Sequence, residues 1–238
     1  MVIIPTPFPS QSFPKAWTMD TDPEGLLPRA LGDDYMSLHP MVQARLGTSV
    51  EKGIACIGEG VMTRMKPGPA WLRPVLRLLK GSHSLLPDRG ENVPFVIENY
   101  PYRDPQGQES LTFVHTFYFP KVIRRLDMYL TRNEGHNAVT GYVGRSRRLI
   151  TPMSLGVNSQ GHLRVRSGKL KLRLGKWTLP IGPGFYSEIE EWYDPAEDCM
   201  RIRNSVAHPF LGGLYRYEGW YRFRFVKVDG VPAHAMAR

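Results

Sequence analysis

His115 is the residue whose type and setting are best suited to chemistry in this sequence. It stands in a predicted strand whose alternate positions are otherwise apolar: Leu111, Phe113, Phe117 and Phe119. Alternate residues of a strand share one face of a sheet, so the imidazole is expected on an apolar face. Such an imidazole either has a buried hydrogen-bonding partner or points at a ligand. If this face lines a cavity, His115 is a candidate acid–base or hydrogen-bonding group, because burial readily changes its charge state.

Glu98 is the second candidate for chemistry. It alternates with Val96, Tyr100 and Tyr102, one predicted hairpin away from His115. A carboxylate among tyrosines can have a raised pKa and act as a general base. The same spacing also fits a glutamate on the outer face of a sheet, paired with an arginine. The alternation does not require Glu98 to share a face with His115, so both interpretations stay open.

Aromatic residues with polar groups are typical of ligand cavities, because a Tyr hydroxyl or Trp N–H needs a partner when it is buried. Several of these residues must point inward if the predicted strands form a closed sheet. The residues predicted to line a ligand site are Tyr100, Phe113, Phe117, Tyr142, Trp192 and Tyr217.

The familiar catalytic and cofactor motifs are absent from the sequence. There is no GxGxxG, P-loop, HExxH, GxSxG or paired CxxC motif, and the seven histidines lack the spacing of a metal-binding pair. The sequence therefore predicts no metal and no cofactor, and it names no reaction.

Charged residues flank a predicted turn at Asp194-Pro195. Glu188 and Glu190 precede it, and Arg201 and Arg203 follow it. A hairpin brings such residues opposite one another across two strands. The pattern favours cross-strand ion pairs over a carboxylate pair for hydrolysis.

The clearest structural pattern runs from His162 to Leu174, in HLRVRSGKLKLRL. Aliphatic and basic residues alternate strictly, which is typical of a strand with one buried face. Ser167-Gly168 lies in the middle, where a two-residue turn would fit. The segment therefore predicts a hairpin with an apolar inner face and a basic outer face.

Short strands continue through most of the chain after Gly90, with turn residues between them. Eight to ten strands of this kind predict an antiparallel meander that closes to protect its edges. Residues 28–46 predict two short helices broken at Pro40, and residues 70–80 an amphipathic helix that caps one end. The predicted fold is mainly β (α+β), a lipocalin-like antiparallel barrel or strongly curved sheet. Residues 28–238 form this domain, after a proline-rich extended arm over 1–27.

Charge is distributed unevenly along the chain. The net charge is +9, but residues 1–120 carry 11 basic and 12 acidic side chains, whereas residues 121–238 carry 20 and 10. A basic outer face of the strand-rich half could meet nucleic acid, an anionic membrane or an acidic partner, or it could only be solvated.

The sequence predicts a cytoplasmic protein with no transmembrane segment. It has two cysteines, no apolar run of roughly 18 residues and no recognisable signal peptide.

Several stretches resemble a bacterial family called domain of unknown function 4166. They are RALGDDYMSLHPMVQARLG, GIACIGEGVM, VPFVIENYPYRD, LTFVHTFYF, EWYDPAEDCMRI and GLYRYEGWY, and the resemblance covers about residues 28–226. Members of that family occur alone and fused to Rossmann-type dehydrogenase-like modules. The resemblance implies a compact, separable domain that acts on or presents a small molecule, and it supplies no catalytic residues.

Three functions follow from these observations. The first is binding of an apolar or amphipathic small molecule in a barrel cavity, since a barrel of about eight strands is just wide enough for one ligand. The alternative is a cofactor-independent cyclase or isomerase acting on a hydrophobic metabolite, with His115 or Glu98 as the acid–base group. The third is a basic outer face that binds an anionic partner.

Overall fold

The computed structural model describes residues 25–70, 83, 86, 88–132, 139–181 and 184–236. The predicted helix 70–80, apart from its first residue, and nearly all of the predicted arm 1–27 lie outside the described residues.

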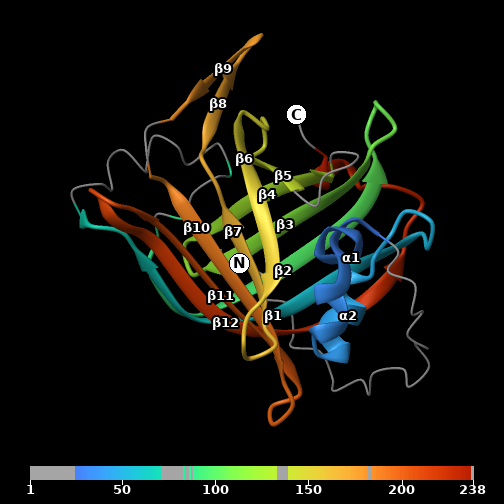
Figure 1. Ribbon diagram of the computed structural model, residues 1–238. Coiled ribbons are helices and arrows are strands. Elements are labelled where there is room, and N and C mark those ends of the chain that lie inside the picture. Colours follow the sequence, from blue (N-terminus) through green and yellow to red (C-terminus); the bar gives the residue numbers. More distant parts are fainter. Residues whose placement is uncertain are drawn as a thin grey trace.

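The described residues form twelve strands, each antiparallel to its neighbours. They are β1 (Ile54–Pro67), β2 (Gly90–Arg103), β3 (Glu109–Phe119), β4 (Val122–Arg132), β5 (Val139–Val143), β6 (Leu149–Val157), β7 (Leu163–Ser167), β8 (Lys171–Leu174), β9 (Trp177–Pro180), β10 (Tyr186–Asp194), β11 (Cys199–His208) and β12 (Gly212–Lys227). Pairing of β5 with β6 and of β1 with β12 closes ten of them into a barrel, and β8 and β9 extend from β6 (Figure 1). The predicted antiparallel, lipocalin-like barrel is confirmed.

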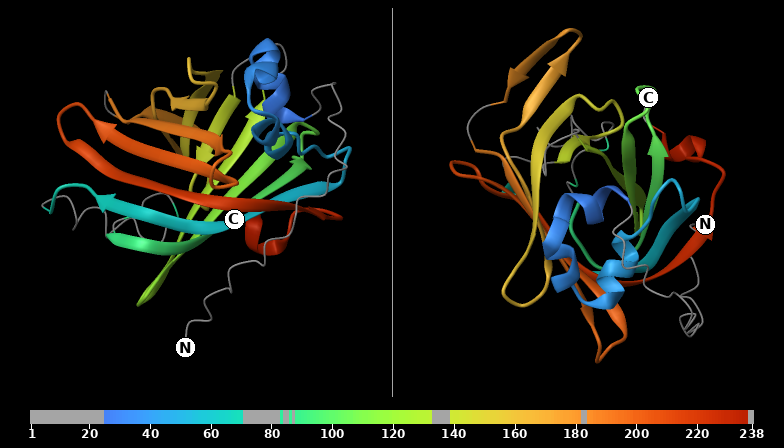
Figure 2. Two further views of the ribbon diagram at one scale, coloured as in Figure 1. Left: turned by 90° about the horizontal axis from the view of Figure 1, so that it is seen from below. Right: turned by 45° about the vertical axis from the view of Figure 1, so that its right-hand side comes forward.

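Three short helical segments precede the barrel: α1 (Leu26–Leu31), the 3-10 helix η1 (Gly32–Ser37) and α2 (Pro40–Leu46). Pro40 is the first residue of α2. A proline is tolerated there because the first N–H groups of a helix have no partner within the helix. Their apolar side chains join the main core, and the helices cover one opening of the barrel (Figure 2). None of the described helices is long and apolar enough to cross a membrane.

The hairpin predicted over 162–174 is wrong. β7 and β8 do not pair with each other, because both run antiparallel to β6, with Ser167 opposite Met153 and Lys171 opposite Ile150. The chain therefore continues in one direction through Gly168, whose N–H donates to the carbonyl of Pro152 at 2.7 Å. The alternation correctly predicted that both halves of this segment are strands. It could not show which strand each half would pair with. The chain reverses later, at Gly175 between β8 and β9, where φ is +59°.

The barrel wall has an apolar core on each face. The main core fills the interior and includes Phe95, Ile97 and Phe117. A smaller core lies on the outer face, where Tyr100 and Val114 pack under the short 3-10 helix η4 (Ala233–Ala235). Side chains of one strand can therefore be buried on either side of the wall, and burial alone does not place a residue inside the barrel.

Candidate functional site

A cluster of polar side chains lies inside the barrel, contributed by β3, β11 and β12. Asn204 Nδ2 donates to the Tyr217 hydroxyl at 2.9 Å. The same hydroxyl lies 3.5 Å from His115 Nδ1, so Tyr217 reaches from its own strand toward β3. All three side chains are at most 5% exposed. They lie inside because alternate residues of each strand point inward.

The chemistry of His115 follows from this burial. Burial, together with a smaller contribution from the nearby positive charge of Arg45, lowers its pKa to about 3. The ring is therefore neutral at physiological pH. Because Tyr217 already accepts from Asn204, its hydroxyl hydrogen is free to point at His115 Nδ1, which assigns the ring hydrogen to Nε2.

Several polar atoms of this interior have no hydrogen-bond partner among the described residues. They are His115 Nε2, Asn204 Oδ1 and both amide atoms of Asn99. Asn99 shares the inner face of β2 with Ile97, which lies opposite His115. A buried polar atom left unpaired costs about 1–3 kcal/mol, so such a group is typically satisfied by a ligand or by ordered water.

A second buried cluster links the helices to the barrel. Arg45 of α2 and Glu191 of β10 form an ion pair, with Nε and Oε1 2.8 Å apart and side chains 3% and 4% exposed. The Tyr221 hydroxyl of β12 is hydrogen-bonded to both. Burial raises the pKa of Glu191, and the guanidinium of Arg45 opposes that shift. The pair holds α2 against the wall.

The predicted site residues did not include Arg45, Asn99, Glu191 or Asn204. The alternation could have indicated that Glu191 is buried. Glu191 shares a strand face with Ile189 and Tyr193, whereas the glutamates at 188 and 190 lie on the other face. For Asn204 the corresponding signal is Met200 and Ile202 on the same face of β11. Arg45 gave no such signal, because a helix of seven residues does not show which side it buries.

The structure brings together four of the predicted site residues. Phe113, His115, Phe117 and Tyr217 all belong to the interior. The rings of Phe117 and Tyr217 lie 5.7 Å apart, centroid to centroid, and those of His115 and Phe117 lie 6.2 Å apart. These aromatic rings surround the polar atoms of the cluster.

Glu98 and Tyr100 lie on the outer face of the wall. Ile97 is opposite His115, so the pleat turns Glu98 the other way. Its carboxylate accepts from the Tyr100 hydroxyl at 2.7 Å and lies 3.0 Å from His234 Nε2. Glu98 and His115 are therefore on opposite sides of the wall and do not share a site.

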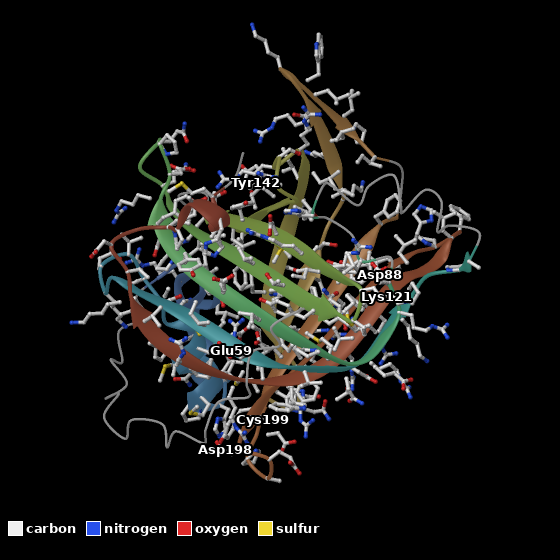
Figure 3. All side chains as sticks on the ribbon, turned by 180° about the vertical axis from the view of Figure 1, so that it is seen from behind. Glu59, Asp88, Lys121, Tyr142, Asp198 and Cys199 are labelled. Carbon is white, nitrogen blue, oxygen red and sulfur yellow. The ribbon has the colours of Figure 1, made fainter. Side chains whose placement is uncertain are left out.

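Tyr142 and Trp192 also lie on the outer face. Tyr142 is half-buried, and the guanidinium of Arg173 lies 5.6 Å from its ring. Figure 3 shows Tyr142 far from Cys199, the first residue of β11. Trp192 stacks on His162 at 4.7 Å. Neither residue contributes to the interior cluster.

The predicted ion pairing across the turn between β10 and β11 is partly correct. Arg203 lies opposite Glu190, with Nη1 and Oε2 3.4 Å apart. Glu188 pairs instead with Arg164 and Arg166 of β7, which is the neighbour of β10 on its other side. The sequence of a hairpin cannot show the strand that flanks it.

A cavity of about 710 Å³ lies outside the barrel wall, beside the segment that follows β12. Its lining includes Tyr102, Thr112, Arg147, Val231 and Met236. Tyr102 and Thr112 belong to the outer face, so the wall separates this cavity from His115. Thr112 Oγ1 is buried and has no hydrogen-bond partner in the described part of the chain.

No group of three or more metal-ligating side chains occurs in the described ranges.

The comparison with known proteins gives one named relative, an uncharacterised protein called YndH from Bacillus subtilis (strain 168). It is 25% identical over 191 residues, which cover 79% of this chain and 92% of the relative. No solved structure matches the chain. The model of the family described as "Domain of unknown function (DUF4166)" matches residues 38–221, and the chain therefore belongs to this family.

Proposed function

We propose that the barrel binds an uncharged amphipathic small molecule in its interior. The observation that carries this proposal is the set of unpaired polar atoms on His115, Asn204 and Asn99. A hydroxyl or carbonyl group of the ligand would accept from His115 Nε2, and a donor group would satisfy Asn204 Oδ1. The apolar part of the ligand would contact Phe113 and Phe117, as is typical of pockets lined by aromatic rings with a few polar groups.

The charges of the interior favour an uncharged ligand. His115 is neutral because its pKa is about 3, and Arg45 is neutralised by Glu191 at 2.8 Å. A ligand carboxylate placed beside His115 would be desolvated without a free cation to pair with among these residues, which is costly.

The same groups favour binding over proton transfer. A general acid or base works best with a pKa near the working pH. Burial holds the pKa of His115 below neutrality and raises the pKa of Tyr217 from its ordinary value of 10.0, which is already above neutrality. This argues for a hydrogen-bonding role for His115 and against the cyclase or isomerase alternative.

Native mass spectrometry of freshly purified protein, compared with the denatured protein, tests the proposal. We expect an excess mass that disappears on denaturation and belongs to an uncharged amphipathic compound. Titration with N-phenyl-1-naphthylamine, an uncharged fluorescent amphiphile with one N–H donor, provides an independent test. We expect Asn204→Leu to weaken its binding by about tenfold, the value of one hydrogen bond.

Glu98→Gln is the matched control, because Glu98 lies on the other side of the same wall. It should leave binding of the fluorophore unchanged. Circular dichroism would verify that both variants are folded. If the fluorophore bound equally well to the Asn204→Leu and His115→Phe variants, the interior would not be the binding site.

A further inference from the structure

The hairpin formed by β8 and β9 projects away from the barrel. Figure 1 and the right panel of Figure 2 both show it standing clear of the other strands. Two of its residues stand in register with β6, Leu172 opposite Leu149 and Lys171 opposite Ile150. Arg173 adds two hydrogen bonds to this junction, from its N–H to the Arg148 carbonyl at 2.8 Å and from Nη2 to the Arg147 carbonyl at 3.1 Å. Beyond this junction, β8 and β9 pair with each other.

One face of this hairpin is apolar and exposed. Leu172 lies opposite Leu179, and Leu174 lies opposite Trp177, so these cross-strand pairs gather on one side. Trp177 is 75% exposed, Leu179 50% and Leu174 45%. An exposed apolar face of this kind on a soluble domain is typical of an interaction surface.

The hairpin carries only positive charges, and Lys171 and Arg173 lie on the face opposite the apolar one, because they alternate with Leu172 and Leu174. Lys169, Lys171, Arg173 and Lys176 lie in or beside the hairpin, and no acidic residue occurs between Glu134 and Glu188. All four side chains are exposed. In the described part of the chain, none of the three lysines forms an ion pair. The hairpin therefore presents free cations to an anionic partner.

We propose that the β8–β9 hairpin docks on the surface of an anionic lipid membrane. Tryptophan sits at the level of the lipid headgroups, where its ring is apolar and its N–H is solvated. Leu174 and Leu179 enter the boundary of the acyl chains beside it. The lysines, at the turn, at the base and on the other face of the hairpin, direct their ammonium groups to lipid phosphates around it. This proposal is independent of the interior ligand site.

The aliphatic residues distinguish a membrane from nucleic acid as the partner. Binding of single strands uses aromatic rings on which bases stack. Leu174 and Leu179 cannot stack, and Trp177 is the one aromatic ring of the hairpin. Aliphatic side chains on the exposed face gain free energy only when they leave water for an apolar environment.

Co-sedimentation of the full-length protein with lipid vesicles tests the proposal. We expect binding to vesicles of equal parts phosphatidylcholine and phosphatidylglycerol, and little binding to phosphatidylcholine alone. Replacing Lys169, Lys171 and Lys176 with Gln should weaken binding by on the order of 100-fold, since each basic residue near an anionic surface contributes about fivefold. The double variant Leu174→Ser/Trp177→Ser should also lose most of its binding.

Two control variants keep the result interpretable. Ile123 is 52% exposed in a different part of the barrel, so Ile123→Ser matches the apolar replacements, and Lys121→Gln matches a lysine replacement. Both should bind vesicles like the unmodified protein. Quenching of tryptophan fluorescence by brominated lipid should be present in the unmodified protein and lost in Trp177→Phe.

Three results would overturn the proposal. The first is equal binding to neutral and anionic vesicles. The second is binding to a single-stranded oligonucleotide, but not to vesicles, that the lysine replacements abolish. The third is a dimer in sedimentation velocity that dissociates in the Leu174→Ser/Trp177→Ser variant, because a second copy would then cover this face.

Discussion

Arg45 in α2 and Glu191 in β10 form an ion pair that is almost completely shielded from water, with 2.8 Å between Nε and Oε1. It joins a helix that precedes the barrel to a strand near the end of the chain. Two buried charges of this kind are costly to separate, so the position of α2 over the barrel opening depends on both partners.

Replacing Arg45 with Met should destabilise the protein strongly. The variant leaves the Glu191 carboxylate buried without its cation, and we expect the free energy of unfolding to fall by about 3–5 kcal/mol. Replacing both residues with Met should recover most of this loss, because apolar side chains of similar volume can substitute for a buried pair. Urea denaturation of Arg45→Met, Glu191→Met and the double variant measures the coupling.

The exposed pair Arg103–Glu51 provides the control, with side chains 54% and 44% exposed. Arg103→Met should change the free energy of unfolding by less than about 1 kcal/mol, as is typical of surface pairs. Equal losses in Arg45→Met and Arg103→Met would contradict the role assigned to the buried pair.

His115 should make the stability of the protein depend on pH. Its pKa is about 3 in the folded state, compared with 6.5 as its ordinary value. Between these two values the unfolded chain binds a proton that the folded protein does not, so the free energy of unfolding falls as the pH falls. The slope is at most about 1.4 kcal/mol per pH unit.

The His115→Phe variant should lack this part of the slope. Urea denaturation at pH 6.5, 5.5 and 4.5 should show the variant losing less stability than the unmodified protein as the pH falls. The carboxylates titrate in both proteins, so their contribution cancels when the stability of one protein is subtracted from that of the other. Parallel pH profiles would mean that His115 is not buried as a neutral ring.

Cys56 should be unreactive in the native protein. Its side chain is 1% exposed, and burial raises the pKa of the thiol to about 12, so almost no thiolate is present at neutral pH. In a Cys199→Ser variant, the reaction with Ellman's reagent should occur only as urea unfolds the protein. Rapid modification in native buffer would show that this end of β1 opens frequently.

Gly60 should not tolerate a side chain. A Cβ at this position would collide with the carbonyl oxygen of Trp220 and with the backbone of Tyr221 in the neighbouring strand. Gly60→Ala should therefore lower the thermal unfolding midpoint, with a cost of at least about 1–3 kcal/mol. Gly213→Ala is the control, because its Cβ would meet nothing within 4 Å and the midpoint should barely change.

The alternation of residues in single strands predicted much of the interior. Phe113, His115 and Phe117 share a face as expected, because the pleat of a strand is a local property. Arg203 also lies opposite Glu190 as expected, since a tight turn sets the pairing of its own two strands. These features needed no information from distant parts of the chain.

Features that depend on distant neighbours were not predictable in the same way. The Ser167-Gly168 pair is typical of a turn, but the strands before and after it, β7 and β8, both pair with β6. The chain therefore does not reverse there. The face on which Glu98 and Tyr100 lie was equally undetermined, because the chain after β12 buries Tyr100 on the outside. Alternation defines two faces of a strand without showing which of them is the interior.

The hairpin of β8 and β9 is joined to the barrel by two residue pairs with β6 and by the hydrogen bonds of Arg173, and the ring of ten strands closes without it. Shortening, lengthening or recharging this hairpin would leave every strand pairing of the barrel in place. Mutations can therefore change the surface of the hairpin without disturbing the residues around His115. The exposed surface of the hairpin and the interior of the barrel can therefore change independently of each other.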